Sequence, residues 1–175
     1  MKKKTWQVVI SGAGGQGLVL AGNVLGEAAA IHENLHAVQT QSYGVASRGG
    51  FSKAEVIVGE EEIAYPKVNK PDVILTLTEE AFNIALGRKE KETFILYDSS
   101  VIAYGGQDER IIGYPFEDLA RELGSTAVVN MLGLGVIVHK TGVVSKESII
   151  NVLDEKYSRY PLNVTAFKKG IEISE

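Results

Sequence analysis

The feature that most constrains this chain is a glycine-rich turn between an apolar segment and a helical pattern. Residues 6–10 read WQVVI, a β-branched run typical of a buried strand, and the turn Gly12-Ala13-Gly14-Gly15-Gln16-Gly17 follows. From Gln16 to about Ile31, apolar residues recur on one helical face, and the small Ala21 and Gly22 let this helix lie close to a sheet. Strand, glycine turn and helix in this order predict a Rossmann-like beginning.

The rest of the chain continues to alternate short strands with helices. We expect strands at about residues 36–40, 54–58, 73–77 and 94–97, an edge strand near 110–113, and helices from Thr78 and over 115–123, 145–157 and 161–173. Residues 127–138 are very apolar but contain Gly133 and Gly135; we favour a helix there. The pattern predicts an α/β fold: one Rossmann-like domain over residues 1–175, with a mostly parallel sheet and helices on both faces.

Composition excludes several classes of protein. The chain has 175 residues, 45% of them hydrophobic, and a net charge of −4, which is typical of a soluble globular protein. The Lys2–Lys4 run is too short for a nucleic-acid-binding stripe. No apolar run approaches the roughly 20 residues of a membrane span, and the N-terminus lacks a signal-peptide pattern. We therefore expect a cytoplasmic protein that binds neither nucleic acid nor membrane.

The absence of cysteine limits the chemistry further. Without cysteine the chain can hold no disulfide, no nucleophilic thiol and no thiolate-bound iron–sulfur cluster. His32, His36 and His139 show no metal-ligand spacing. We therefore predict neither a metal site nor a catalytic residue in this chain.

The glycine turn alone suggests a nicotinamide-dependent enzyme. Gly12, Gly14 and Gly17 fit the G-x-G-x-x-G spacing, and the following helix offers N–H groups to an anion. However, an NAD site needs an acid at the end of the second strand, about 20 residues beyond the turn. Glu33 satisfies the count but precedes that strand, whose end carries only Gln39, Thr40 and Gln41. The sequence therefore argues against an NAD site.

A second motif lies at residues 41–52, QSYGVASRGGFS, where the ribose-binding acid would be expected. Arg48 could grip a phosphate or carboxylate with two parallel hydrogen bonds, and the backbone around Gly49 and Gly50 could bind an anion. Alternatively, Arg48 pairs with Glu55 and only shapes the loop. The other candidate hydrogen-bonding groups of the motif are Ser42, Tyr43, Ser47 and Ser52.

Together the two motifs identify a family. GAGGQG at 12–17 followed by QSYGVASRGG at 41–50 resembles the gamma subunit of 2-oxoacid:ferredoxin oxidoreductases, a domain also fused into pyruvate:ferredoxin oxidoreductase. The subtype is most similar to the 2-oxoglutarate or general 2-oxoacid form, since the indolepyruvate subunit usually has a His-Gly-Met-Ser-like segment where this chain has residues 42–45. Further matches extend over the whole chain, at Ile63–Pro66, Pro71-Asp72, Tyr97–Ser100, Asn130-Met131, Asn163, Ala166-Phe167 and Gly170.

The resemblance implies an accessory subunit that is inactive alone. In that family, the complex decarboxylates a 2-oxoacid, joins the acyl group to coenzyme A and passes electrons to ferredoxin. Thiamine diphosphate and iron–sulfur clusters are held by other subunits, so this chain would bind no cofactor by itself. Its expected partners are alpha, beta and ferredoxin-like delta subunits, and the isolated chain could also form a homodimer.

We therefore expect the two motifs to form one surface at the carboxyl ends of the strands. This surface would close over a partner's thiamine site or receive the phosphates of coenzyme A. Asp98-Ser99-Ser100 could line the same edge or cap a helix, and Asn130 could be an inner-edge polar contact or a core feature. Two other interpretations remain: a stand-alone NAD(P)-binding reductase, and a non-catalytic nucleotide-sensing module.

Overall fold

A six-stranded sheet forms the centre of the protein. The computed structural model describes residues 3–44 and 49–175. The strands lie side by side in the order β2-β3-β1-β4-β5-β6. Their bounds are β1 (Thr5–Ala13), β2 (His36–Tyr43), β3 (Phe51–Gly59), β4 (Val73–Thr76), β5 (Phe94–Asp98) and β6 (Ile111–Tyr114).

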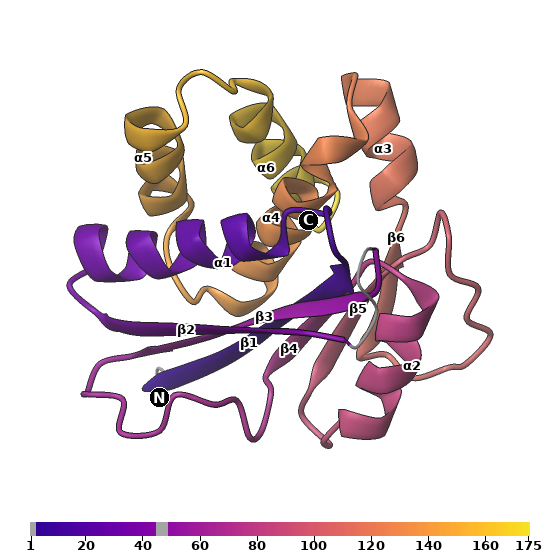
Figure 1. Ribbon diagram of the computed structural model, residues 1–175, viewed down its shortest axis with the longest axis horizontal. Helices are drawn as coiled ribbons and strands as arrows, with labels where there is room; N and C mark the ends of the chain where they lie inside the picture. The colour runs from indigo at the N-terminus through magenta and orange to yellow at the C-terminus, as the bar shows by residue number, and fades with distance from the viewer. Residues whose placement is uncertain (1–2, 45–48) are drawn as a thin grey trace.

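Helices cover both faces of this sheet, as the sequence predicts. On one face lie α1, α4, α5 and α6, whereas α2 packs on the other (Figure 1). The bounds are α1 (Leu18–Glu27), the π-helix η1 (Ala28–His32), α2 (Glu79–Arg88), α3 (Phe116–Leu123), the 3-10 helix η2 (Thr126–Val128), α4 (Val129–Thr141), α5 (Lys146–Lys156) and α6 (Leu162–Glu172). The segment 127–138, ambiguous in sequence, is helical as favoured.

The sheet is mostly parallel, with one antiparallel strand in it. β1, β4, β5 and β6 run parallel, whereas β3 is antiparallel to both β1 and β2. Only residues 44–50 connect β2 to β3, and a parallel connection needs a crossover of a dozen or more residues. The short connection therefore turns β3 back between β2 and β1.

Alternating residues of the strands supply two apolar cores. Val8 and Ile10 of β1 belong to the core beneath α1 and α4, whereas Val9 belongs to the smaller core beneath α2. Phe82 of α2 is 3% exposed and belongs to the second core. This alternation is what a strand buried on both sides requires.

Several element bounds differ from the sequence prediction. β2 continues through Gln41, Ser42 and Tyr43, and β3 already begins at Phe51, so the polar motif is largely a β-hairpin rather than a loop. The prediction ended the strands where apolar residues end, but backbone pairing between strands does not depend on apolar side chains. The first helix begins at Leu18 rather than Gln16, because Gly17 adopts a left-handed backbone with φ of 71°.

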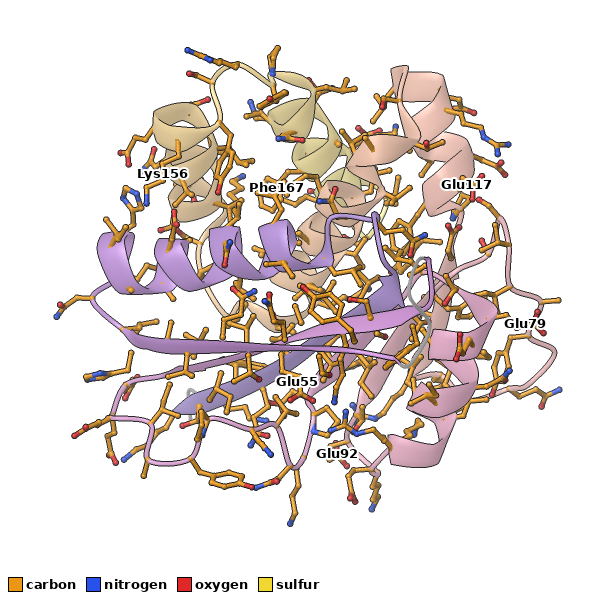
Figure 2. All side chains as sticks on the ribbon, viewed as in Figure 1. Glu55, Glu79, Glu92, Glu117, Lys156 and Phe167 are labelled. Carbon is orange, nitrogen blue, oxygen red and sulfur yellow. The ribbon has the colours of Figure 1, made fainter. Side chains whose placement is uncertain are left out.

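Two glycines let α4 and α6 cross in backbone contact. A Cβ added to Gly135 would lie 2.3 Å from the carbonyl oxygen of Phe167, and one added to Gly170 would lie 2.1 Å from that of Leu132. Backbone atoms cannot rotate away as a side chain can. Phe167, buried in the same helix pair, marks this region in Figure 2.

Gly135→Ala should therefore lower the free energy of unfolding by about 1–3 kcal/mol or more, because the methyl group forces the helices apart. The matched control is Gly87→Ala in α2, where an added Cβ meets nothing within 4 Å. That change should stabilise the protein by about 0.5–1 kcal/mol through helix propensity. Urea unfolding of both variants tests the difference, and equal effects would contradict it.

Candidate functional site

The glycine turn leaves the carboxyl end of β1 and is closed by its own side chain. Oε1 of Gln16 accepts a hydrogen bond from the N–H of Ala13 at 2.8 Å, and the N–H of Gln16 donates to the oxygen of Ala13 at 3.3 Å. Gly15 and Gly17 have positive φ angles, 92° and 71°, which favour glycine. Hydrogen bonds within the protein and left-handed glycines thus hold the shape of the turn.

Asn130, at the start of α4, fixes the end of the turn. Its Nδ2 donates to the oxygen of Gly17 at 2.9 Å, while its Oδ1 accepts from the N–H of Met131 at 2.9 Å. The side chain is 1% exposed, and a Cβ on Gly17 would approach Nδ2 to 2.4 Å. Asn130 is therefore both a buried residue and a polar contact at the inner edge, which combines the two interpretations of the sequence.

The second motif meets the turn directly. The N–H of Gly14 donates to the oxygen of Gly50 at 3.1 Å, and β3 places Ser52 beside Gly12. The structure therefore brings together the glycine turn and the described parts of the hairpin, at the carboxyl ends of β1 and β2. Ser47 and Arg48 lie outside the described residues.

The hairpin residues differ in their accessibility. Ser42 and Tyr43 are exposed, with 66% of Tyr43 accessible, and Gly49 is exposed at a φ of 65°. Ser52, by contrast, is 3% exposed. A partner or ligand can therefore reach Tyr43 and Gly49 in this structure, whereas Ser52 supports the hairpin from inside.

A cavity of about 340 Å³ lies beside the turn. Gly15 and Gln16 line it together with Glu117, Ser125, Thr126, Ala127 and Val129. Glu117 brings a negative charge that pairs with Arg121 of the same helix, and Figure 2 shows Glu117 at the base of α3. The two sequence motifs do not predict the lining residues between positions 117 and 129. The sequence signal that could have indicated them is Ser125, a residue type that often caps helices. Its hydroxyl accepts a hydrogen bond from the N–H of Ala127 at the start of η2.

Asp98 is the last residue of β5, and its side chain caps α3. Its carboxylate is 2% exposed and accepts from the N–H groups of Ser100 at 3.0 Å and Glu117 at 3.2 Å. Burial raises the pKa of Asp98, and these hydrogen bonds act in the opposite direction. Of the two interpretations from the sequence, helix capping is the one these contacts support, since Glu117 lies in the first turn of α3.

Glu55 forms a charge cluster on the face that α2 covers (Figure 2). Its Oε1 accepts from Nζ of Lys53 at 2.7 Å and from Nη1 of Arg88 at 3.2 Å. Burial raises the pKa of Glu55, but hydrogen bonds and charge attraction from Lys53 and Arg88 outweigh it, and the net pKa is lowered. Glu55 is thus already bonded to two cations from β3 and α2, which the sequence did not connect.

Replacing Glu55 by Gln should lower the free energy of unfolding at pH 7 by about 1–3 kcal/mol. The lowered pKa means that this stabilisation exists above the ordinary value of 4.5 and is lost as pH falls through the folded-state value. Urea unfolding at pH 7 and at about pH 3 should show the gap between variant and parent shrinking. The exposed Glu62→Gln serves as control, and a gap independent of pH would contradict the assignment.

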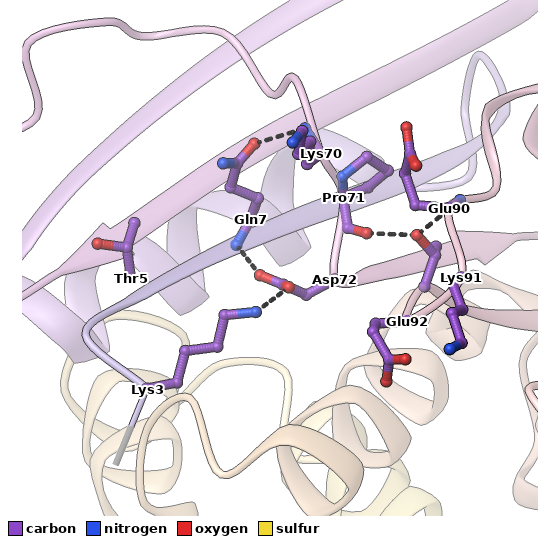
Figure 3. A pocket seen from close by; sticks show the side chains of 10 residues that line it. Lys3, Thr5, Gln7, Lys70, Pro71, Asp72, Glu90, Lys91 and Glu92 are labelled. Atoms are coloured by element: carbon purple, nitrogen blue, oxygen red, sulfur yellow. Dashed lines mark hydrogen bonds and ion pairs between the residues drawn. The ribbon is translucent and has the colours of Figure 1, made fainter. Parts of the chain in front are cut away.

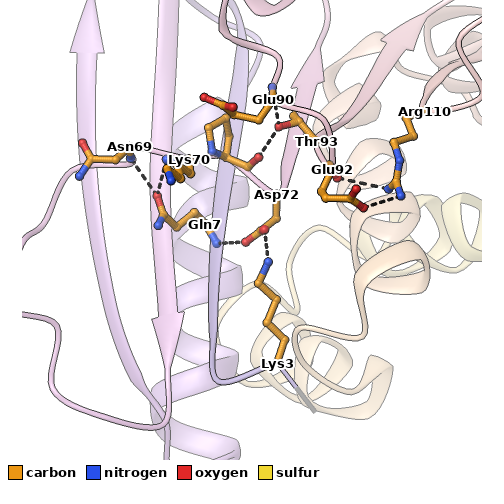
Figure 4. Close-up of polar contacts among 10 residues, drawn as sticks. Lys3, Gln7, Asn69, Lys70, Asp72, Glu90, Glu92, Thr93 and Arg110 are labelled. Carbon is orange, nitrogen blue, oxygen red and sulfur yellow. Dashed lines mark hydrogen bonds and ion pairs between the residues drawn. The ribbon is translucent and has the colours of Figure 1, made fainter. Parts of the chain in front are cut away.

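A second polar cavity, of about 350 Å³, lies at the other end of the strands, near the starts of β1, β4 and β5 (Figure 3). Lys3 pairs there with Asp72, which also accepts from the N–H of Gln7 at 2.8 Å. Thr93 donates to the oxygen of Pro71 at 2.7 Å (Figure 4). These groups bind one another and hold the loops around β1 and β4, so we do not assign this cavity as the candidate site.

The geometry argues against a dinucleotide site at the glycine turn. The N–H groups of Ala13, Gly14 and Gln16 are already bonded within the protein, so they cannot cradle a pyrophosphate as in an NAD enzyme. β3 also separates β2 from β1, which moves the end of β2 about 4.8 Å further away. Glu33, the only acid at the expected count, accepts instead from Ser145 and Ser148 of the α5 cap.

The described residues contain neither a candidate metal site nor a membrane-spanning helix. Over residues 3–44 and 49–175, no group of three or more His, Cys, Asp or Glu side chains is placed to hold a metal ion. In the same part of the chain, none of the helices has the length and apolarity needed to cross a bilayer.

Asn130→Ala should loosen the glycine turn. The change removes two buried hydrogen bonds and leaves the N–H of Met131 without its side-chain acceptor, so we expect a loss of about 1–3 kcal/mol in unfolding free energy. Asn151→Ala, on the exposed face of α5, should change it by less than about 0.5 kcal/mol. Urea denaturation measures both, and a neutral Asn130→Ala would refute the role of this residue.

Comparisons with known proteins agree with this geometry. The model of the pyruvate ferredoxin/flavodoxin oxidoreductase family matches residues 7–173. The chain is 36% identical to the 2-oxoglutarate synthase subunit KorC of Methanocaldococcus jannaschii, over 97% of this chain and 94% of the relative. Its KorC relative in Methanothermobacter marburgensis is 40% identical, with 95% of each chain covered.

Solved structures give the same result. The gamma subunit of a keto/oxoacid ferredoxin oxidoreductase from Geobacter sulfurreducens superposes with a TM-score of 0.83 at 35% identity, over 97% of this chain and 98% of that chain. The 2-oxoglutarate:ferredoxin oxidoreductase of Magnetococcus marinus shares the fold, with a TM-score of 0.86 at 22% identity, over 99% of this chain and 31% of that one. The resemblance noted in the sequence is therefore confirmed, and the chain belongs to the pyruvate ferredoxin/flavodoxin oxidoreductase family.

Proposed function

We propose that this chain is the gamma subunit of a 2-oxoacid:ferredoxin oxidoreductase. The observation that carries the proposal is the joining of the glycine turn to the hairpin through Gly14 and Gly50, in a chain that matches gamma-type relatives over nearly its full length. In such a complex the enzyme decarboxylates a 2-oxoacid, transfers the acyl group to coenzyme A and reduces ferredoxin. The stand-alone NAD(P) reductase is not favoured by the relatives or by the turn.

We assign 2-oxoglutarate as the substrate of the complex. Relatives named for 2-oxoglutarate synthase reach 36–40% identity over 95–97% of the chain. A relative named as the indolepyruvate oxidoreductase subunit IorB reaches 26% over 94% of the chain. The hairpin sequence supports the same assignment, because residues 42–45 of this chain are Ser-Tyr-Gly-Val and differ from the His-Gly-Met-Ser-like segment of the indolepyruvate type.

The side chains available as ligands limit which cofactors this chain could hold. A cysteine-free chain cannot ligate an iron–sulfur cluster through thiolates, so the clusters belong to other subunits. As the family resemblance implies, thiamine diphosphate would also be held by other subunits, and a ferredoxin-like delta subunit would pass electrons to ferredoxin. This assembly would work in the cytoplasm.

Within the complex, the turn and hairpin would form a wall near the thiamine and coenzyme A site. The turn's own hydrogen bonds give it a fixed shape, which suits a wall that excludes water and positions a ligand. Gly15, Tyr43 and Gly49 are among the exposed residues of this wall, and Arg48 would supply the charge for a phosphate of coenzyme A. Asn130 would act indirectly, because its side chain donates a hydrogen bond to the oxygen of Gly17 and so holds the turn in place.

The proposal is tested in the complete complex. A tagged copy of the chain, expressed in its source cell, should co-purify with thiamine-binding and iron–sulfur subunits and with coenzyme A-dependent oxidation of 2-oxoglutarate. The chain alone should show no such activity and no thermal stabilisation by NADH. Stabilisation by NADH with hydride transfer by the isolated chain would overturn the proposal in favour of the reductase.

The same complex tests the wall. Gly15→Ala adds a methyl group to an exposed residue of the turn at a φ of 92°, and Gly142→Ala does so at 62° at the far end of α4. Each should cost about 1–2 kcal/mol in stability, because both residues are left-handed. Only Gly15→Ala should raise the KM for coenzyme A or weaken assembly, by about tenfold. Equal kinetics and equal assembly for the two variants would exclude the wall.

A further inference from the structure

The β2 strand forms an edge of the sheet without the usual protection of an edge. Within the described residues, β2 pairs only with β3, and every residue of β2 is at least partly exposed. Its sequence, HAVQTQSY, contains no Lys, Arg, Asp, Glu or Pro. Exposed edges of this length are normally blocked by charge, proline or a bulge, because their free N–H and C=O groups bind other strands.

The backbone pattern shows which groups β2 presents outward. The N–H of Gly44 donates to the oxygen of Phe51, the residue opposite it in the β2–β3 register, at 2.6 Å. Hydrogen-bonded pairs recur at every second residue of an antiparallel ladder, so Ser42, Thr40 and Val38 face β3. The N–H and C=O groups of the alternate residues point away from the sheet, namely Ala37, Gln39, Gln41 and Tyr43.

A shallow groove of about 250 Å³ lies beside this edge. Small residues form much of it, and its lining comprises Asn23, Gly26, Glu27, Ala30, Ile31, Ala37 and Gln39. Ile31 adds an apolar side chain to this lining that is 58% exposed. In Figure 1, β2 and α1 run beside each other along this edge. The edge thus combines free backbone groups with an apolar hollow on the α1 side.

We propose that β2 pairs antiparallel with β2 of a second copy of this chain, joining the two sheets across a two-fold axis at Thr40. In this register Gln39 lies opposite Gln41, and Ala37 lies opposite Tyr43, so all four outward residues are hydrogen-bonded. The register places no like charges opposite each other, and Thr40 meets Thr40 of the second copy, a favourable cross-strand pair. An isologous interface must be self-complementary in this way.

The side chains fit the same arrangement. Residues 37 and 39 face α1, as their place in the groove shows, and alternation along the strand puts Tyr43 on that face too. Tyr43, 66% exposed in one copy, would then lie opposite Ala37 in the other, where the groove is lined by Gly26 and Ala30. Each copy would thus place an aromatic ring into the hollow of its partner.

The chain's lack of cysteine gives a direct test. Thr40→Cys places two thiols opposite each other in a non-hydrogen-bonded pair, about 4.5 Å apart at Cα, which is within disulfide range. Mild oxidation of the full chain should give a covalent dimer. Gln41→Cys is the register control, because its nearest copy lies diagonally, about 7–8 Å away, and should cross-link far less.

A charge variant tests the interface without covalent cross-linking. Thr40→Lys places two cations opposite each other and should raise the dimer dissociation constant at least about tenfold, measured by sedimentation. At concentrations where the parent is monomeric, the unfolding transition should be unchanged. A parent chain that stays monomeric at about 100 μM, or equal cross-linking of the two cysteine variants, would overturn the proposal. So would a Thr40→Cys cross-link to a different subunit in the purified complex, which would leave the proposed function intact.

Discussion

The glycine turn after β1 is held by protein groups on three sides, and this constraint organises the rest of the molecule. The Gln16 side chain closes it from within, Gly50 binds it from the hairpin, and Asn130 holds its last residue from α4. A turn open to a dinucleotide would present these N–H groups to the ligand. The same glycine spacing therefore produces a rigid surface here, and that surface is what the chain can offer to a larger assembly.

The antiparallel β3 makes this possible. Because it lies between β1 and β2, the end of its hairpin comes within hydrogen-bonding distance of the turn. There the carbonyl oxygen of Gly50 accepts from the N–H of Gly14, a group that a dinucleotide site would offer to its ligand. In a dinucleotide-binding sheet the second strand lies directly beside the first and brings its acid toward the ribose. One reversed strand thus changes both the distance and the chemistry at the site.

Much of the fold could be predicted from the sequence, because apolar periodicity reports burial. The buried strands β1, β4 and β5 and the capped helix after Thr78 appear where the pattern places them. The hairpin bounds could not, since Gln41, Ser42 and Tyr43 pair through backbone groups that the pattern does not see. The contact between Asn130 and Gly17 joins residues 113 positions apart, and no local signal encodes that distance. The family resemblance identified the motifs as related, but only the structure shows how they touch.

The close crossing of α4 and α6 has a mechanical consequence. Gly135 and Gly170 bring the two helix backbones together with no side chain between them to deform, so the pair behaves as one stiff body. The start of α4 carries Asn130 and hence the last residue of the glycine turn. A force that tilts α6 would therefore be transmitted through α4 to the glycine turn.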